Sequence, residues 1–215
     1  MTGAPHLGGV ILAAGESSRM GSDKALLLWP PPAPGSSTLP SQTLLFAAII
    51  ALRPLTRAVV VVAGSNAAHL APTADACGAS LAVNAAPWRG QFSSLRVGLR
   101  ELLVRGCDAA IITPVDCPPL SAASLELLVA SFASALPRSL WAVAPENNGK
   151  HGHPLLVSRE LIDAFLAAPA TSNARAVLRT HPERIEYVPV LDALEKAGLN
   201  TPEDYAARAK EPPAL

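Results

Sequence analysis

Gly9-Val10-Ile11-Leu12-Ala13-Ala14-Gly15-Glu16-Ser17-Ser18-Arg19-Met20-Gly21-Ser22-Asp23-Lys24 is the stretch that decides the fold. Its first half is a short apolar run with β-branched residues, which is typical of a fully buried strand in a parallel sheet. Its second half is small and polar, and it carries two cations, Arg19 and Lys24. Open α/β folds bind ligands beyond the carboxyl ends of such strands, so we expect a ligand-binding loop here.

The composition of this loop predicts a polyphosphate site. Glycine tolerates positive φ and lets backbone N–H groups approach an anion closely. The planar guanidinium of Arg19 and the compact ammonium of Lys24 can both hold phosphate oxygens. The P-loop motif is excluded, because it has four residues between its glycines and Lys-Ser/Thr directly after the second. Here five residues separate Gly15 from Gly21, and two more precede Lys24. The three-glycine dinucleotide motif is also absent.

The stretch resembles the L-A-A-G-x-S-x-R-M-G-x-x-K signature of the molybdenum-cofactor nucleotidyltransferases, a MobA-like group within the nucleoside-triphosphate transferase superfamily. The matching positions are Leu12, Ala13, Ala14, Gly15, Ser17, Arg19, Met20, Gly21 and Lys24. The resemblance implies a three-layer Rossmann-like nucleotidyltransferase fold of the α/β class. It also implies that Arg19 and Lys24 are catalytic residues that bind the β- and γ-phosphates. The residues implied to bind the nucleotide are Leu12, Ala13, Ala14, Gly15 and Gly21.

The composition indicates a cytoplasmic protein that binds neither nucleic acid nor a membrane. The 215 residues are half hydrophobic, and we expect them to form one domain over residues 1–215. Lys plus Arg and Asp plus Glu both total 17, so no basic excess favours a polyanionic partner. The longest apolar run, residues 44–52, is far shorter than the ~20 residues that span a bilayer. The amino terminus lacks the basic region of a secretory signal, and Cys77, Cys107 and Cys117 lack C-x-x-C spacing, which favours reduced thiols.

Apolar runs and helical patterns alternate along the chain, which predicts a mostly parallel sheet covered by helices on both faces. We expect further strands at 58–63, 79–84, 109–113, 141–144, 154–157 and 185–189. We expect helices at 41–52, after 90–94, from 121, from 158, at 173–179 and from 201. Residues 30–40 contain five prolines, which predict an irregular surface loop rather than a regular element. This Pro-rich loop is expected to add no residue to the site, and a partner-binding polyproline segment is the alternative.

Asp116 is the best candidate for a metal-binding carboxylate. It follows a buried strand, so its carboxylate should lie at the carboxyl edge of the sheet beside the first loop. Magnesium prefers a few carboxylates together with phosphate oxygens and water. Residues 114–118 resemble the family's D-x-P motif, whose aspartate ligates the metal, which implies that Asp116 is both a catalytic residue and an Mg²⁺ ligand. The alternative is that Asp116 only forms the turn.

Residues 198–204 resemble the closing N/D-x-P-E-D segment of these enzymes. In relatives the position of Asn200 supplies a second contact to the metal. An amide oxygen can coordinate Mg²⁺ but adds no charge, so Asn200 should be the weaker ligand. The alternative is that Asn200 only shapes the approach to the helix that begins at Thr201.

Two further stretches resemble substrate-binding parts of the family. Residues 84–99 resemble its N-x-x-W-x-x-G-x-x-x-S-L-x-x-G-L pattern, with the tryptophan and the first glycine closer together here. The resemblance implies that Asn84 and Ser94 bind the nucleotide, although Ser93 or Ser94 could equally cap the helix that begins there. His153, in a G-x-P stretch, and Arg175 fall where the family contacts its acceptor, but loop histidines are often only polar surface.

The resemblance therefore implies a magnesium-dependent transfer of a nucleoside monophosphate to the phosphate of molybdopterin, with release of pyrophosphate and a possible molybdoenzyme or chaperone partner. CTP is the favoured donor, because the guanine-using branch has Gly where this chain has Ala14, and the Ala14 methyl leaves less room for a purine. GTP, a sugar phosphate or another alcohol phosphate remain open as alternative substrates. A nucleotide- or cofactor-binding carrier without activity is the alternative from another class.

Overall fold

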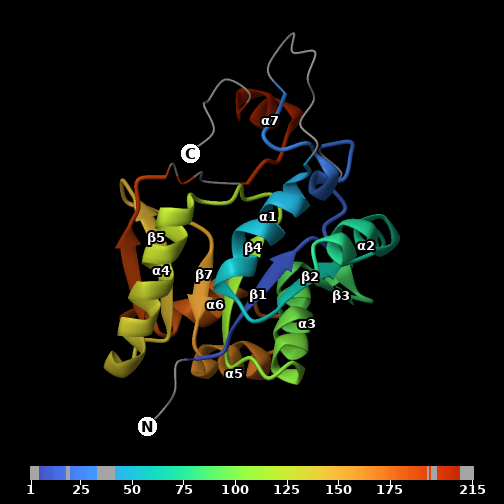
Figure 1. The fold of residues 1–215 in the computed structure, drawn as a ribbon. Helices are drawn as coiled ribbons and strands as arrows, with labels where there is room; N and C mark the ends of the chain where they lie inside the picture. Colours follow the sequence, from blue (N-terminus) through green and yellow to red (C-terminus); the bar gives the residue numbers. More distant parts are fainter. Residues whose placement is uncertain (1–4, 18–19, 33–41, 193, 195–197, 209–215) are drawn as a thin grey trace.

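The computed structural model describes residues 5–17, 20–32, 42–192, 194 and 198–208 (Figure 1). Within them the strands are β1 (Leu7–Leu12), β2 (Val59–Ala63), β3 (Ser80–Val83), β4 (Ala109–Pro114), β5 (Ala142–Asn147), β6 (Lys150–His151), β7 (Leu155–Val157) and β8 (Ile185–Pro189). The α-helices are α1 (Leu44–Leu52), α2 (Ala67–Ala76), α3 (Gln91–Val104), α4 (Ala122–Ala135), α5 (Arg159–Ala167), α6 (Ala174–Arg179) and α7 (Pro202–Arg208). The strands form one sheet with helices on both sides, which confirms the predicted α/β class.

The sheet has the strand order β3-β2-β1-β4-β7-β5-β6, and β8 also pairs with β5. The pairs β1–β2, β1–β4, β2–β3 and β5–β8 are parallel, whereas β7 is antiparallel to both β4 and β5. Strand β6 is antiparallel to β5. All described strands except β6 and β7 therefore run in one direction, as predicted. Leu12 pairs with Pro114, so β1 and β4 end side by side and their following loops share one edge of the sheet.

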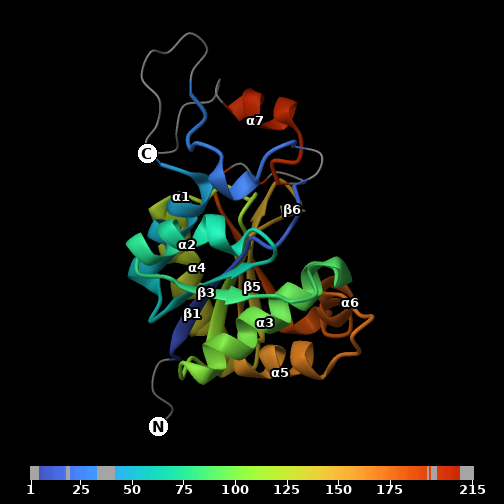
Figure 2. The ribbon, with the colours of Figure 1, turned by 90° about the vertical axis from the view of Figure 1, so that its right-hand side faces the viewer.

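Two hydrophobic cores make the molecule a three-layer structure (Figure 2). Every residue of β1 is buried, and neighbouring side chains point to opposite faces. Ile11 packs in the core under α1, α2 and α4, whereas Val10 packs in the core under α3, α5 and α6. A run of apolar residues without alternation thus forms β1 because both faces of this strand are covered by helices.

Two elements differ from the sequence-based expectation. No helix was predicted between β2 and β3, but α2 lies there and carries Pro72 in its interior. Only Leu70 and Ala74 of this helix are buried, so its apolar periodicity is weak. Strand β6 was not predicted either, because its two residues are exposed and polar. Helix α2 connects β2 to β3, and β6 is the last strand in the order of the sheet. Neither element changes the carboxyl edge of the sheet.

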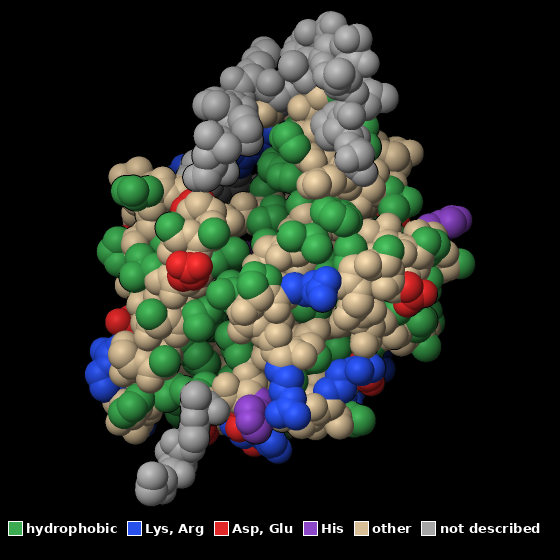
Figure 3. All heavy atoms as spheres, in the orientation of Figure 1, with side chains coloured by type: hydrophobic (Ala, Val, Ile, Leu, Met, Phe, Trp, Pro, Cys, Tyr) green, Lys and Arg blue, Asp and Glu red, His purple; other side chains and the backbone are tan. Residues whose placement is uncertain are grey.

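The Pro-rich loop begins and ends at neighbouring points of the fold. The backbone N–H of Trp29 donates to the carbonyl oxygen of Gln42 at 2.8 Å. Residues 33–41 of the loop lie outside the described residues. On the face seen in Figure 3, basic side chains occur in small separate groups among neutral and hydrophobic ones. In the parts of the chain that the structure describes, no helix is both long enough and apolar enough to cross a membrane.

Candidate active site

The loop after β1 is held in place by the next strand of the sheet. Asn66, which follows the end of β2, donates through Nδ2 to the carbonyl oxygen of Ala13 at 2.9 Å and to Asp23 Oδ2 at 2.7 Å. The other carboxylate oxygen of Asp23 accepts from the N–H of Ala25 at 3.0 Å and caps the short 3₁₀ helix that begins at Lys24. This network fixes the backbone position from which the Lys24 side chain extends. Asn66 was missed by the sequence analysis, although its place directly after a buried strand is the signal that could have found it.

Lys24, Asp116 and Asn200 meet at one point beneath this loop. Lys24 Nζ donates to Asp116 Oδ2 at 2.8 Å and to Asn200 Oδ1 at 2.8 Å. The side chains of Lys24 and Asp116 are only 12% and 24% exposed, so this ion pair is largely shielded from water. Residues from three distant parts of the chain are therefore brought together, as the sequence predicts.

The oxygens at this point fit a magnesium ion. Asp116 and Asn200 direct a carboxylate oxygen and an amide oxygen toward a common cationic centre, the Lys24 ammonium. Magnesium takes hard oxygen ligands and usually keeps water and substrate phosphate as its other ligands. In the described ranges, no group of three or more His, Cys, Asp and Glu side chains could hold a metal ion. Among the described residues, Asp116 and Asn200 would thus be the two ligands, with further ligands coming from the substrate and water.

A cavity of about 360 Å³ lies between the first loop and the start of α3. Its lining includes the predicted nucleotide-binding residues Leu12, Ala13, Ala14, Gly15 and Ser94, together with Lys24, Asp116 and Asn200. The alternative that Ser93 or Ser94 only caps α3 is wrong, because Gly90 is the cap residue and both serines lie inside the helix.

Two residues predicted to bind the nucleotide are not part of the lining of this cavity. Asn84 lies behind it, where its Nδ2 donates to Ser93 Oγ at 2.8 Å and to Ser94 Oγ at 2.9 Å. Asn84 therefore orients Ser94 rather than lining the cavity itself.

Gly21 has a φ of +71° and open space around its Cα, so the turn requires glycine there. Arg19, the other predicted catalytic cation, lies outside the described residues.

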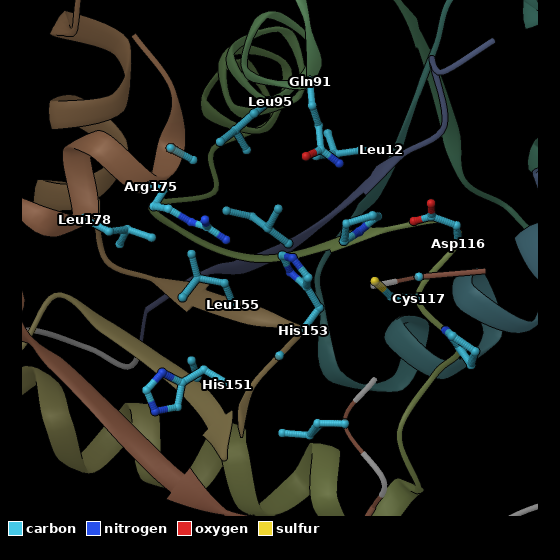
Figure 4. Close-up of a pocket in the computed structure, with 18 of the residues that line it drawn as sticks. Leu12, Gln91, Leu95, Asp116, Cys117, His151, His153, Leu155, Arg175 and Leu178 are labelled. Carbon is cyan, nitrogen blue, oxygen red and sulfur yellow. The ribbon is translucent and has the colours of Figure 1, made fainter. Parts of the chain in front are cut away.

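A second cavity, of about 1160 Å³, opens on the other side of Asp116 (Figure 4). Figure 4 shows His153 near its middle, with Arg175 extending toward it from α6 and Asp116 on the opposite side. Both cavities are lined by Leu12, Gly90, Gln91, Pro114 and Asp116. The two predicted acceptor-side residues thus share one cavity, and this cavity meets the smaller one at Asp116.

The charged lining of the large cavity favours an anion. It includes Arg89, Arg175 and Arg179, against the carboxylates of Asp116 and Asp192. Asp116 is paired with Lys24, and Asp192 accepts hydrogen bonds from Ser121 and Ser124. The arginines are therefore in excess over carboxylates that lack a partner. Pro30 and Pro31 also line this cavity, so the expectation that the Pro-rich loop adds no residue to the site is wrong at its start.

Two other titratable groups in this cavity are held uncharged. Burial lowers the pKa of His153, against opposing effects of the Ile112 backbone and Asp116. Its Nδ1 is buried without a hydrogen-bond partner, which favours the neutral ring. Burial, together with the charge of Asp116, raises the pKa of the Cys117 thiol to about 12. Cys117 is therefore a protonated thiol, and all three cysteines are free.

Known proteins resemble this chain in both sequence and fold. Over 125 residues it is 34% identical to a probable molybdenum cofactor guanylyltransferase from Rhodopirellula baltica, which covers 58% of this chain. The chain spans about half of that relative, at 55% of its length. The crystal structure of Rv0371c from Mycobacterium tuberculosis matches 98% of this chain and 100% of its own, with a TM-score of 0.75 and 20% identity. The same mycobacterial protein has a structure in complex with manganese, which matches 97% of this chain and 100% of that one with a TM-score of 0.68 and 18% identity.

A structure that is named a nucleotidyl transferase has the same fold. The structure of a nucleotidyl transferase from Methanothermobacter matches 94% of this chain and 94% of its own, with a TM-score of 0.69 and 21% identity. A family model described as the MobA-like NTP transferase domain matches residues 9–185, which include the first loop, Asp116, His153 and Arg175. The family predicted from the sequence is thereby confirmed. The chain belongs to the MobA-like NTP transferase domain family.

Proposed function

We propose that this protein is a magnesium-dependent nucleotidyltransferase, acting as one domain over residues 1–215. It moves a nucleoside monophosphate from a triphosphate to the phosphate of molybdopterin and releases pyrophosphate. The observation that carries this proposal is that a small cavity beside the glycine-containing loop and a large arginine-lined cavity meet at Asp116, next to Lys24. A transferase needs this arrangement, because its donor and its acceptor must reach one reaction centre from two sides.

The small cavity takes the nucleotide in this proposal. The backbone of residues 12–15 faces the base and sugar, and Ser94 offers a hydroxyl that Asn84 holds in place. Gly21 permits the turn that brings Lys24 to the β- and γ-phosphates. Arg19, which lies outside the described residues, is proposed to bind the same phosphates. Lys24 is already at the cavity wall, where its ammonium can pass from Asp116 to a phosphate oxygen.

Asp116 and Asn200 would hold the magnesium ion. When bound, Mg²⁺ would neutralise charge on the phosphates and polarise the α-phosphate. The manganese complex of the mycobacterial structure supports a divalent cation in this fold. Lys24 stabilises the negative charge that develops as pyrophosphate leaves, because a fixed cation in a shielded site acts more strongly than a cation in water. Arg19 is proposed to have the same role.

The large cavity takes the acceptor. Its phosphate is the nucleophile, so no serine, cysteine or histidine of the protein has to form a covalent bond. Arg175 binds this phosphate, and the excess of arginines around the cavity favours an acceptor with more than one negative charge. His153 stays neutral beside it and can donate or accept a hydrogen bond without adding charge. A sugar or alcohol phosphate is the alternative acceptor, because the arginines select the phosphate and not the rest of the molecule.

We propose CTP as the donor. The Ala14 methyl is buried and lines the small cavity, so a purine has less room there than a pyrimidine. One methyl-sized contact discriminates by about 1–3 kcal/mol, so we expect a preference of roughly 10-fold to 200-fold. GTP is the second candidate, since the Rhodopirellula relative is named a guanylyltransferase.

The thermal midpoint of unfolding tests this assignment, because a ligand stabilises the fold according to its affinity. With Mg²⁺ present, CTP should raise the midpoint more than GTP at the same concentration, and Ala14→Gly should narrow the difference. Stabilisation by GTP without stabilisation by CTP would contradict the cytidylyl assignment and leave nucleotidyl transfer in place. No stabilisation by either triphosphate would contradict the nucleotide site itself and also exclude a nucleotide carrier.

The proposed product also suggests where the protein acts. A nucleotide-linked molybdenum cofactor is used by molybdoenzymes, so we propose a molybdoenzyme, or a chaperone that delivers the product to one, as the partner. We further propose the cytoplasm as the compartment, which suits three cysteines that are free thiols.

A further inference from the structure

Gly198 lies directly against the carboxylate of Asp116. The segment that contains it crosses the turn after β4, where the N–H of Leu199 donates to the carbonyl oxygen of Asp116 at 2.8 Å. The carbonyl oxygen of Gly198 accepts from Asn200 Nδ2 at 2.7 Å. Asn200 Oδ1 in turn accepts from Lys24. One short segment therefore touches both the backbone and the side chain of Asp116 and also presents Asn200.

This position has no space for any side chain. A Cβ atom on Gly198 would lie 2.6 Å from the carbonyl oxygen of Asp116, 2.7 Å from its Cγ and 2.8 Å from its Oδ1. The first of these atoms is backbone, so the contact cannot be relieved by a side-chain rotation alone. Close approach to Asp116 is therefore what requires glycine here.

We propose that Gly198 is a positioning residue for the metal site, an inference that rests on the proposed function. Its bare Cα forms the wall beside Asp116 Oδ1, which leaves Oδ2 directed at Lys24 and at the centre shared with Asn200. A methyl group at Gly198 has to displace the carboxylate, displace the Asp116 backbone, or separate residues 198–200 from the turn. Each of these movements takes Asp116 and Asn200 out of their common geometry, and ligand geometry decides cation binding.

Gly198→Ala tests this inference, with Gly98→Ala as a matched control. A Cβ on Gly98, inside α3, would lie 2.6 Å from Val10 Cγ1 and 2.8 Å from Val62 Cγ2, a conflict of similar size in the core. Mn²⁺ is titrated into each protein at saturating CTP or GTP, whichever stabilises the wild type, and free Mn²⁺ is measured by electron paramagnetic resonance. Gly198→Ala should weaken Mn²⁺ binding at least tenfold. Gly98→Ala should lower the thermal midpoint and leave Mn²⁺ affinity within twofold of the wild type.

A second comparison shows whether Gly198 acts through Asp116. Asp116→Ala removes Cγ and Oδ1 but leaves the conflict with the Asp116 carbonyl oxygen. If Gly198 acts on the metal through the carboxylate, adding Gly198→Ala to Asp116→Ala should cause a clearly smaller further loss of Mn²⁺ binding than Gly198→Ala causes in the wild type. If Gly198→Ala alone does not fold, the double variant should recover part of the lost stability, and no recovery would overturn the inference. Wild-type Mn²⁺ affinity in Gly198→Ala, or an equal further loss in the Asp116→Ala background, would also overturn it.

A third measurement separates this inference from the proposed function, because it needs neither metal nor nucleotide. Gly198→Ala and Lys24→Met are combined in a double-mutant cycle of thermal stability. Both changes disrupt the contact between Lys24 and Asp116, so the double variant should lose clearly less than the sum of the two single losses. Additive losses would overturn the positioning role. The wild type could bind no Mn²⁺ with any triphosphate while the two variants still show this coupling. That pair of results would contradict the proposed function and retain Gly198 as the residue that orients Asp116.

Discussion

Lys24→Met replaces the ammonium group that bridges Asp116 and Asn200 with an uncharged side chain of similar length. Lys24 Nζ is 2.8 Å from Asp116 Oδ2 and 2.8 Å from Asn200 Oδ1. These are the two oxygens that we assign to the metal. A divalent cation bound to them must first displace the ammonium, so Lys24 and the cation compete until a triphosphate offers Lys24 another partner.

The size of this competition follows from the contact that must break. A hydrogen bond to a charged group contributes about 1.5–3 kcal/mol net. The side chains of Lys24 and Asp116 are only 12% and 24% exposed, so little water screens the contact between them. We therefore expect the free-energy contribution of this contact to fall within that range. Each 1.4 kcal/mol corresponds to a factor of ten in affinity, so Lys24→Met should tighten Mn²⁺ binding without nucleotide by roughly 10-fold to 150-fold. Its effect on triphosphate binding should have the opposite sign.

In the assay, Mn²⁺ is titrated into the protein without nucleotide, and free Mn²⁺ is measured by electron paramagnetic resonance. Lys150→Met is the matched control, since it removes the same charge from an exposed position in β6 and is not part of either cavity lining. It should leave Mn²⁺ affinity unchanged. Calorimetry should then show that Lys24→Met weakens triphosphate binding more than monophosphate binding. Unchanged or weaker Mn²⁺ binding by Lys24→Met would refute the claim that the ammonium and the metal share their oxygens.

Three further outcomes are expected. Arg19→Ala should weaken triphosphate binding more than monophosphate binding in calorimetry, and equal losses would remove Arg19 from the phosphates. Burial lowers the pKa of His153 in the folded protein. As the pH falls through the ordinary histidine pKa of about 6.5, His153 therefore binds a proton in the unfolded chain but not in the folded one. The free energy of unfolding should therefore fall below that pH by up to about 1.4 kcal/mol per pH unit. His153→Asn should flatten this slope in urea titrations, and an unchanged slope would contradict the effect of burial on His153. A glycine-serine turn in place of residues 31–38 should preserve the thermal midpoint and nucleotide affinity, because hydrogen-bonded residues flank the loop. A fall in either quantity would mean that the loop supports the nucleotide site.

The carboxyl edge of the sheet was predictable because the features that create it are local. Uninterrupted apolar runs at β1 and β4 could form only buried strands, and each is followed by polar residues with a recognisable function. Helix α2 was not predictable in the same way. It buries few residues and contains Pro72, so it lacks the apolar periodicity that marks the other helices, although five of its ten residues are alanine, a strong helix former.

The sequence allowed us to predict which residues belong to the site, but not which of their atoms contact one another. Lys24 is 92 residues from Asp116 and 176 residues from Asn200, and no pattern in the sequence states that its ammonium rests on both. The sequence assigned Lys24 to phosphate alone, whereas the structure adds a contact with the proposed metal ligands. Gly198 was missed because its role arises only from a contact between distant segments.

Nucleotidyl transfer itself is the most direct test of the central claim. Purified protein is incubated with Mg²⁺, molybdopterin and each of the common triphosphates in turn, while pyrophosphate release and the mass of the product are measured. We expect pyrophosphate and a product heavier by one nucleoside monophosphate, CTP being the best donor. Asp116→Asn should remain folded and lose at least ~100-fold in kcat, since the missing charge acts on the transition state. A folded wild type that releases no pyrophosphate with any triphosphate, or an Asp116→Asn variant with full magnesium-dependent activity, would contradict the account.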